Sequence, residues 1–210
     1  TIEWGITKTQ ADKVWALGYT GQGIVIGGDD TGYDWTHPAL KKKYRGWNGT
    51  SADHNYNWHD AVKSGNGGAC GINALAPCDD FGHGTHTMGT MVGDDEAGNQ
   101  IGMAPGASWI GCRNMDVGNG TFTMYVECFQ FFLAPTDLTN SNANPLKSPH
   151  VINNSWGCIE SEGCNSSNYA TMETVIKNLN AAGIVVVSSS GNSGPNCSTI
   201  DTPPSIFANS

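Results

Sequence analysis

The chain has 210 residues, which is enough to bury one sizeable core and suits a single domain. Its formal net charge of −9 at pH 7 argues against nucleic acid and anionic membranes as partners, because both select for basic surfaces. The apolar runs at 24–26 and 184–187 are far too short to cross a bilayer. We therefore expect no nucleic acid partner and no membrane partner.

Strand and helix patterns alternate along the chain. Strands are expected at 23–27, 108–112, 150–154 and 184–187, and helices at 84–92, 121–133 and 170–181. This alternation predicts an α/β fold with a mainly parallel central sheet that helices cover on both faces. Residues 44–80 have little periodicity and are interpreted as a long surface insertion. Catalytic groups in such sheets lie at the carboxyl ends of the strands.

Asp30-Thr31-Gly32 stands at the end of the first predicted strand. A catalytic triad needs an oriented, desolvated carboxylate that fixes a histidine tautomer, and Asp30 is placed to supply one. Asp29 is a competing carboxylate, but the spacing of the glycines favours Asp30. Two other interpretations remain for this motif alone, namely an ordinary turn or a glycine-rich nucleotide-binding loop.

His83-Gly84-Thr85-His86 opens the next predicted helix, and small residues there allow the helix to pack close to the sheet. We expect a ring nitrogen of His83 within about 2.6–3.2 Å of the Asp30 carboxylate. His86 is expected to turn away into packing. The alternatives are a structural histidine or a metal shared by His83 and His86, but no third ligand with convincing spacing accompanies them. We therefore expect no metal at this site.

Asn192 follows Gly191 at the end of the last predicted strand. An amide donor on such a turn can stabilise a developing oxyanion, which is worth about 3–4 kcal/mol of barrier. A plain Gly-Asn turn is the alternative. Together with Asp30 and His83, Asn192 completes three of the four groups that a serine hydrolase needs.

From about Trp15 to Ser210, apart from the insertion near 64–80, the chain resembles the subtilisin-like serine proteases (subtilases), and most of all their bacillopeptidase F-like branch. The segments that carry the resemblance are VWALGYTGQGIVIG, DTGYDWTHPALKKKYRGWN, HGTHTMGTMVG, IGMAPGASWI, HVINNSWG and VVSSSGN. The resemblance implies a three-layer subtilisin-like fold and a serine endopeptidase, made as a zymogen. It matches Asp30 and His83 to the catalytic Asp and His, and Asn192 to the oxyanion-hole Asn.

The resemblance also implies where a polypeptide substrate binds. Ser155, Trp156 and Gly157 match one wall of the primary specificity pocket, and the other wall matches Ser189, Ser190 and Gly191. The edge segment to which the substrate backbone adds as a strand matches Gly118, Asn119 and Gly120. Small side chains and Trp156 in the pocket favour an apolar or aromatic residue before the cleaved bond, with no requirement for a basic one.

The nucleophilic serine motif of the family, Gly-Thr-Ser-Met-Ala at a helix start, is absent. Residues 49–52 imitate it, but they precede His83 in a polar loop, and we reject them. We expect residues 1–210 to be the N-terminal portion of a single catalytic domain, incomplete at its C-terminus. The C-terminal fragment, bound as a second chain, would then bring the serine and pack against residues 184–210. The alternative is a catalytically inactive binding module or a truncated chain.

Two further departures from the family concern packing and calcium. Gly27-Gly28-Asp29 replaces the usual apolar residues before Asp30, which leaves the packing of that carboxylate open. Ala39 stands where many subtilases carry a calcium-binding acid. The acidic run 94–96 is either a cation site or, as we favour, a solvated loop. No cofactor is therefore required, and the place of any calcium ion stays unknown.

Seven cysteines are many for a cytosolic chain of this size, and their spacing is not that of a zinc site. They indicate loop-closing disulfides in a secreted, extracellular protein, with buried free thiols as the alternative. The expected pairs are Cys70/Cys78, Cys158/Cys164 and Cys112/Cys128, the last because a helix packs back across the sheet. Cys197 is left for the other fragment, or for Cys158 or Cys164.

Overall fold

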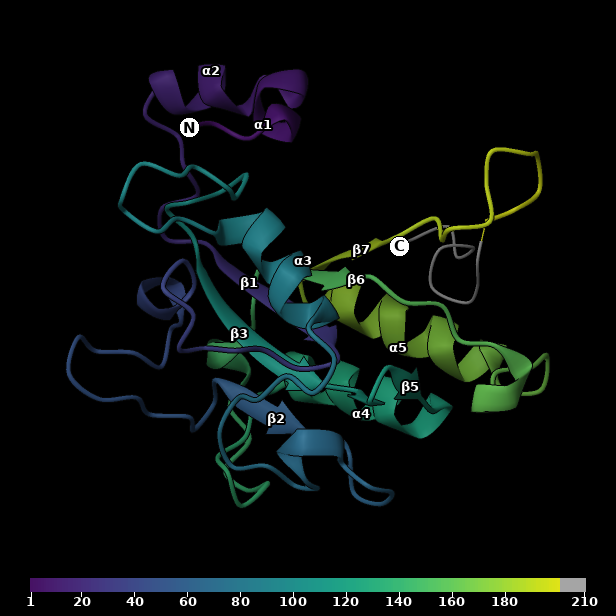
Figure 1. The fold of residues 1–210 in the computed structure, drawn as a ribbon. Helices are drawn as coiled ribbons and strands as arrows, with labels where there is room; N and C mark the ends of the chain where they lie inside the picture. Colours follow the sequence, from purple (N-terminus) through teal and green to yellow (C-terminus); the bar gives the residue numbers. More distant parts are fainter. Residues whose placement is uncertain (201–210) are drawn as a thin grey trace.

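In the computed structural model, which describes residues 1–200, five strands form one parallel sheet in the order β2-β3-β1-β6-β7 (Figure 1). These strands are β1 (Val25–Asp30), β2 (Trp58–Asp60), β3 (Ser108–Arg113), β6 (Val151–Asn154) and β7 (Val185–Ser188). A small antiparallel hairpin is formed by β4 (Met115–Asp116) and β5 (Asn119–Gly120). The helices are α1 (Trp4–Thr9), α2 (Ala11–Ala16), α3 (His83–Val92), α4 (Phe122–Leu133) and α5 (Tyr169–Ala181). Short 3-10 turns span Lys41–Lys43, Gly68–Cys70, Pro145–Lys147 and Glu160–Glu162.

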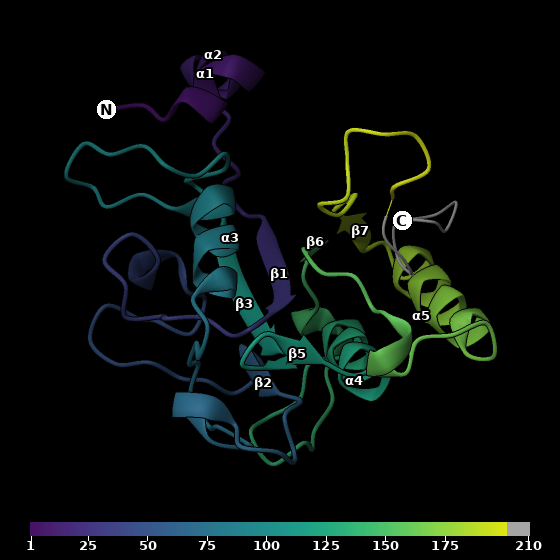
Figure 2. The same cartoon turned by 45° about the vertical axis from the view of Figure 1, so that its right-hand side comes forward.

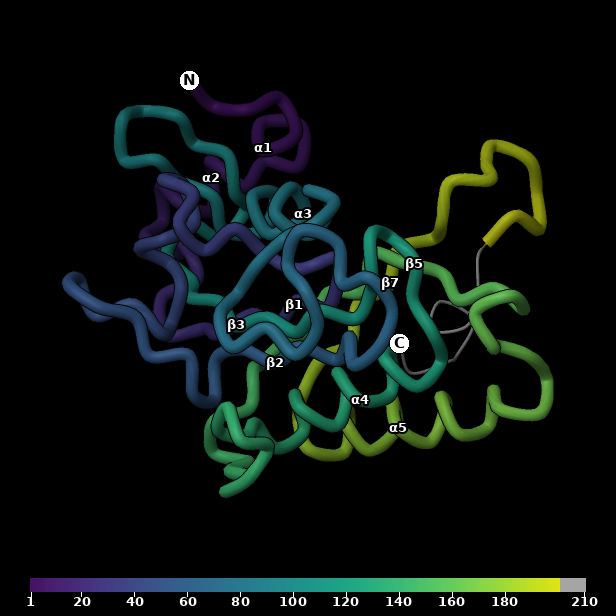
Figure 3. Tube along the Cα trace, turned by 60° about the horizontal axis from the view of Figure 1, so that its bottom comes forward, coloured from purple at the N-terminus to yellow at the C-terminus, as the bar shows by residue number. Residues whose placement is uncertain are grey.

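Helices lie on both faces of the sheet, which confirms the predicted α/β arrangement. Figure 2 shows α3 on one side of the strands and α4 and α5 on the other, and Figure 3 shows α4 and α5 side by side. The larger core lies under α4 and α5, where Phe129 and Phe132 are buried together with Ile152 and Val186. The smaller core lies under α3.

The pattern of apolar residues explains why α4 forms where it does. Its buried residues are Tyr125, Cys128, Phe129, Phe131 and Phe132, which line the side that faces the sheet. Thr121 caps its N-terminus, because its side chain accepts a hydrogen bond from the Met124 amide at 3.3 Å. The observed helix begins one residue later than the predicted one and ends at the same residue.

The prediction of a surface insertion at 44–80 is wrong for part of that segment. It contributes β2 at one edge of the sheet, and Trp58, Ala61 and Val62 are buried. Trp58 packs edge-on against Tyr33 with ring centroids 6.5 Å apart. A strand of three residues is too short to show a two-residue period, so the sequence pattern gave no sign of it. The helices α1 and α2 were also not predicted.

All three predicted disulfides are present, namely Cys70–Cys78, Cys112–Cys128 and Cys158–Cys164. The alternative of buried free thiols is therefore wrong for these six residues. Pairing of Cys197 with Cys158 or Cys164 is also wrong, since those two bind each other. Cys197 is an exposed free thiol within the described residues.

The sheet face that carries α3 is left partly open at its β7 end. Val185 is 57 % exposed and Val187 46 %, whereas Val186 on the opposite face is only 4 % exposed. A hollow of about 270 Å³ lies beside Val187, and Ile26, Met91 and Val151 are also among its apolar walls. The C-terminal fragment is expected to pack against residues 184–210, and part of that segment lies outside the described residues. Within residues 1–200, no helix has the length and apolar character needed to span a membrane.

Candidate active site

Asp29 and Asp30 lie at the carboxyl end of β1 on opposite faces of the sheet, because side chains alternate along a strand. Asp29 is paired in register with Cys112 and Asn154 and lies on the α4 side. Burial raises its pKa well above the usual range, and the indole N–H of Trp156 opposes this rise without making a hydrogen bond of normal geometry. Asp29 is therefore held apart from His83, and the competing assignment of the catalytic carboxylate to Asp29 loses its geometric basis.

Asp30 faces α3 and contacts the first residue of that helix. Its carboxylate oxygens lie 2.7 and 2.9 Å from Nδ1 of His83, which is the contact that the sequence predicts. The Thr31 amide donates to the same carboxylate at 2.7 Å, and Asp30 is only 1 % exposed. Because a carboxylate accepts, Nδ1 of His83 carries the proton and Nε2 is left as the acceptor.

Close backbone packing brings these two residues together. A Cβ atom on Gly84 would lie 2.1 Å from the carbonyl oxygen of Gly32, so only glycine allows α3 to approach the Asp30 loop this closely. A Cβ on Gly28 would similarly lie 2.4 Å from the hydroxyl of buried Tyr33. The side chain of Tyr33 thus occupies the space beside Gly28. This accounts for the packing next to Asp30, which the sequence left open.

Asp79 holds the loop that leads into α3, and sequence reasoning missed it. Its carboxylate accepts hydrogen bonds from the Thr31 hydroxyl (2.8 Å), the amides of Phe81 (3.1 Å), Gly82 (2.7 Å) and Thr85 (2.9 Å), and the Thr85 hydroxyl (2.5 Å). Burial raises the pKa of Asp79, but these hydrogen bonds outweigh it and leave the pKa below its usual value. The available signal was an acid just before a helix start, where free amides need acceptors.

Arg113, at the end of β3, is a second residue that the sequence did not reveal. Its guanidinium is fully buried and lies 2.7 Å from Asp80 and 3.3 Å from Asp60. It also donates to the carbonyl oxygens of Gly67 and Gly71, each at 2.9 Å. Asp80 is the closer ionic partner, and burial raises the pKa of Asp60 even beside Arg113. Arg113 thereby fixes the loop that ends in Asp79.

The environment of His83 raises its pKa above the usual value of 6.5. The largest cause is the hydrogen bond to Asp30; partial burial lowers the pKa, and the charges of Asp30 and Asp79 raise it further. The His83 side chain is 44 % exposed, so its far edge faces solvent. His86 is also exposed, so the prediction that it turns into packing is wrong.

The contacts of His83 predict how activity and stability depend on pH. If His83 acts as a base, kcat/KM of the active protease is expected to rise with pH around a midpoint above 6.5, since only the neutral ring accepts a proton. The protonated His83–Asp30 pair stabilises the fold below pH 6.5, and this contribution is lost as pH rises through the raised pKa. NMR titration of the ring protons checks the value directly. His54 is the internal control, because burial lowers its pKa. A midpoint at or below 6.5 for His83 would contradict the geometry.

A cleft of about 200 Å³ opens beside His83. Four of the predicted substrate-binding residues line it, namely Gly118, Ser155, Trp156 and Gly157. The predicted edge residues Asn119 and Gly120 form β5 and line a neighbouring hollow. Ser189 lies next to the end of β6, since its amide donates to the Asn154 carbonyl at 2.9 Å. Ser190, Gly191 and Asn192 do not line the cleft, and Asn192 is exposed.

The acidic run 94–96 makes its own contacts. Asp95 accepts hydrogen bonds from the amides of Ala97 and Asn99, and Glu96 pairs with Lys42. Within residues 1–200, no group of three or more His, Cys, Asp or Glu side chains is arranged to hold a metal ion. The expectation of a solvated loop stays a prediction.

Comparisons with known proteins agree on a single family. The model of the subtilase family matches residues 21–206. Bacillopeptidase F of Bacillus subtilis is 44% identical over 160 residues, which are 74% of this chain and 10% of that protein. The minor extracellular protease Vpr of the same species is 30% identical over 194 residues, which are 92% of this chain and 20% of that protein. Subtilisin DY of Bacillus licheniformis is 29% identical over 196 residues, or 92% of this chain and 56% of that protein.

Proposed function

Because the chain belongs to the subtilase family, we propose that it is part of a secreted serine endopeptidase in which Asp30 and His83 supply the base. The buried contact of 2.7 Å between Asp30 and Nδ1 of His83 carries the proposal. Asp30 orients the ring and stabilises the imidazolium, while Nε2 accepts the proton of the serine hydroxyl and later gives it to the leaving amine. These roles use protein groups alone.

The roles of the remaining site residues are proposed from membership of the subtilase family, and the cleft beside His83 supports those of Gly118, Ser155, Trp156 and Gly157. Gly118, Asn119 and Gly120 bind the extended substrate backbone, and Ser155, Trp156 and Gly157 flank the residue before the cleaved bond, opposite Ser189, Ser190 and Gly191. Asn192 donates to the oxyanion from the turn after β7. Three disulfides within residues 1–200 support secretion.

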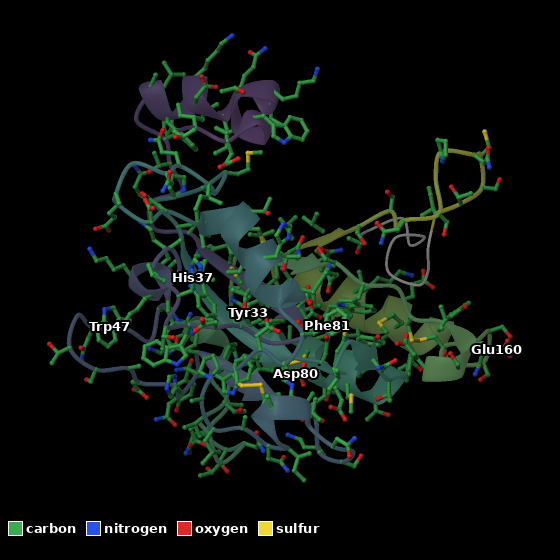
Figure 4. The ribbon with its side chains drawn as sticks, viewed as in Figure 1. Tyr33, His37, Trp47, Asp80, Phe81 and Glu160 are labelled. Atoms are coloured by element: carbon green, nitrogen blue, oxygen red, sulfur yellow. A yellow bond between two sulfur atoms is a disulfide. The ribbon has the colours of Figure 1, made fainter. Side chains whose placement is uncertain are left out.

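We propose that the nucleophile comes from polypeptide outside residues 1–210, so that this chain is the N-terminal portion of one catalytic domain. The chain spans between 10% and 56% of the relatives named above. Ser51, in the one segment that imitates the serine motif, lies in an exposed turn beside Trp47. Figure 4 shows Trp47 at the left edge of the molecule and Phe81, which precedes His83 by two residues, near the centre. The exposed Val185 and Val187 offer an apolar surface for the missing part.

Labelling with a peptide phosphonate that reacts with activated serines tests this function. Intact mass under native and denaturing conditions is expected to show the label on polypeptide other than residues 1–210, held together with them. The His83→Ala variant is the control and should not be labelled. Label on a serine within residues 1–210 would refute the separate nucleophile. Absence of both labelling and hydrolysis in the complete protein would favour the inactive binding module.

A further inference from the structure

We propose that Glu162 selects a basic side chain of the substrate in the cleft beside His83. This inference rests on the proposed function and names a feature of the peptides that the protease prefers. Glu162 belongs to the loop that the Cys158–Cys164 disulfide closes, and it lines the cleft together with Trp156 and His83.

Three neutral donors hold the Glu162 carboxylate in place. The Gly120 amide donates to Oε1 at 3.1 Å, while the Tyr125 hydroxyl and the Ile159 amide donate to Oε2, each at 3.2 Å. Burial and the neighbouring carboxylate raise the pKa of Tyr125, so its hydroxyl remains a donor. An ionised carboxylate has about four acceptor positions, which leaves one for a ligand.

The negative charge of Glu162 has no cationic partner within the described part of the chain. Among residues 1–200, no Lys, Arg or His nitrogen lies within 4.0 Å of its oxygens. Glu162 is the acidic residue of the cleft, whose remaining ionisable groups are His83 and Tyr125. A preorganised carboxylate without a counter-ion favours a cation brought by the substrate.

The walls of the cleft suit the aliphatic part of a lysine or arginine. Tyr125 and Trp156 stack with centroids 3.9 Å apart and planes 8° apart, and Met115 lies among the lining residues. Phe81 is 62 % exposed and also lines the cleft. Long basic side chains lay their methylene stems along such surfaces and place the charged end at a polar group.

The position of Glu162 also indicates which substrate residue it reads. Its contact with Gly120 places it at the edge segment where the substrate backbone is proposed to add as a strand. Successive side chains of such a strand point to opposite sides, so only some positions reach Glu162. The basic residue therefore lies on the acyl side of the cleaved bond, and the peptide series below determines which position it occupies.

Pairs of peptides that differ only in lysine or norleucine at one acyl-side position test the proposal on the complete protease. At one position, kcat/KM is expected to favour lysine by about 10-fold, which corresponds to about 1.4 kcal/mol. The Glu162→Gln variant should bring this ratio close to 1, because it keeps the size of the side chain and removes the charge. Glu160→Gln is the matched control and should keep the ratio. Glu160 is in the same turn but exposed, and Figure 4 shows it at the outer end of the loop, far from Phe81.

A purely structural role for Glu162 has a different signature. Glu162→Gln would then lower kcat/KM equally for both peptides, and this result, or a wild-type ratio of 1 at every position, would overturn the proposal. If no peptide is hydrolysed, the proposed function fails, and the inference is tested by binding of the same peptides, followed through tryptophan fluorescence. Tighter binding of the lysine peptide that is lost in Glu162→Gln would support the basic site, and equal binding would overturn it.

Discussion

Replacing His83 with alanine is expected to lower kcat of the complete protease by about 10⁶-fold, the loss that removal of the triad histidine causes in subtilisin itself. The reason is that His83, which contacts Asp30, is the proposed acceptor of the serine proton. Stability should change little, because His83 is partly exposed and its ring contributes little packing. Single-turnover hydrolysis of a peptide, with thermal unfolding measured in parallel, separates the two effects.

His86→Ala is the matched control for this substitution. His86 lies in the same helix three residues further on and is exposed. Its removal is expected to leave kcat within about 2-fold of the original, as for surface residues that contact nothing of consequence. Comparable losses in the two variants would assign the effect to the helix as a whole and would contradict the role of His83.

The second large effect is expected from Arg113→Met, which should lower the free energy of unfolding by about 3–5 kcal/mol. The substitution leaves Asp80 and Asp60 buried without their cation, and it frees the carbonyl oxygens of Gly67 and Gly71. Urea unfolding with the disulfides intact measures the change. Lys177→Met is the control, because the exposed pair of Lys177 with Glu173 contributes only about 0.3–0.5 kcal/mol.

A double variant distinguishes lost charge balance from lost packing. If the uncompensated carboxylate causes the damage, Arg113→Met combined with Asp80→Asn should recover part of the stability. A double variant no more stable than Arg113→Met would instead point to the loss of the hydrogen bonds to the loop carbonyls.

The contact between Asp30 and His83 could be predicted from the sequence because short-range patterns determine it. Asp30 ends an apolar strand, and His83 begins a helix whose small residues permit close contact with that strand. The disulfides were predictable for a similar reason, since short loops and one helix that packs back on its strand leave few possible pairs. The boundaries of β1 were not, because Gly27 and Gly28 interrupt the apolar run although they continue the strand.

The groups that support the pair could not be predicted, because their partners are distant in the sequence. Arg113 meets Asp60 and Asp80, which lie 53 and 33 residues away. Glu162 reaches Gly120 across 42 residues. From the sequence alone, an isolated acidic residue in a loop is predicted to lie on the solvated surface. Only the folded chain shows which acidic residues lie next to unpaired amides or a buried guanidinium.

The position of β1 between two other strands also determines which parts of the candidate active site are protected from local unfolding. Both neighbours of β1, β3 and β6, hold it through continuous ladders, so exposing its amides to solvent requires disruption of the whole sheet. The cleft walls come instead from the β4–β5 hairpin, whose strands have two residues each, and from the loop that contains Glu162. Amide hydrogen exchange should therefore be slow around Asp30 and faster along the cleft. Local breathing of the walls can then admit different peptides without displacing the carboxylate that orients His83.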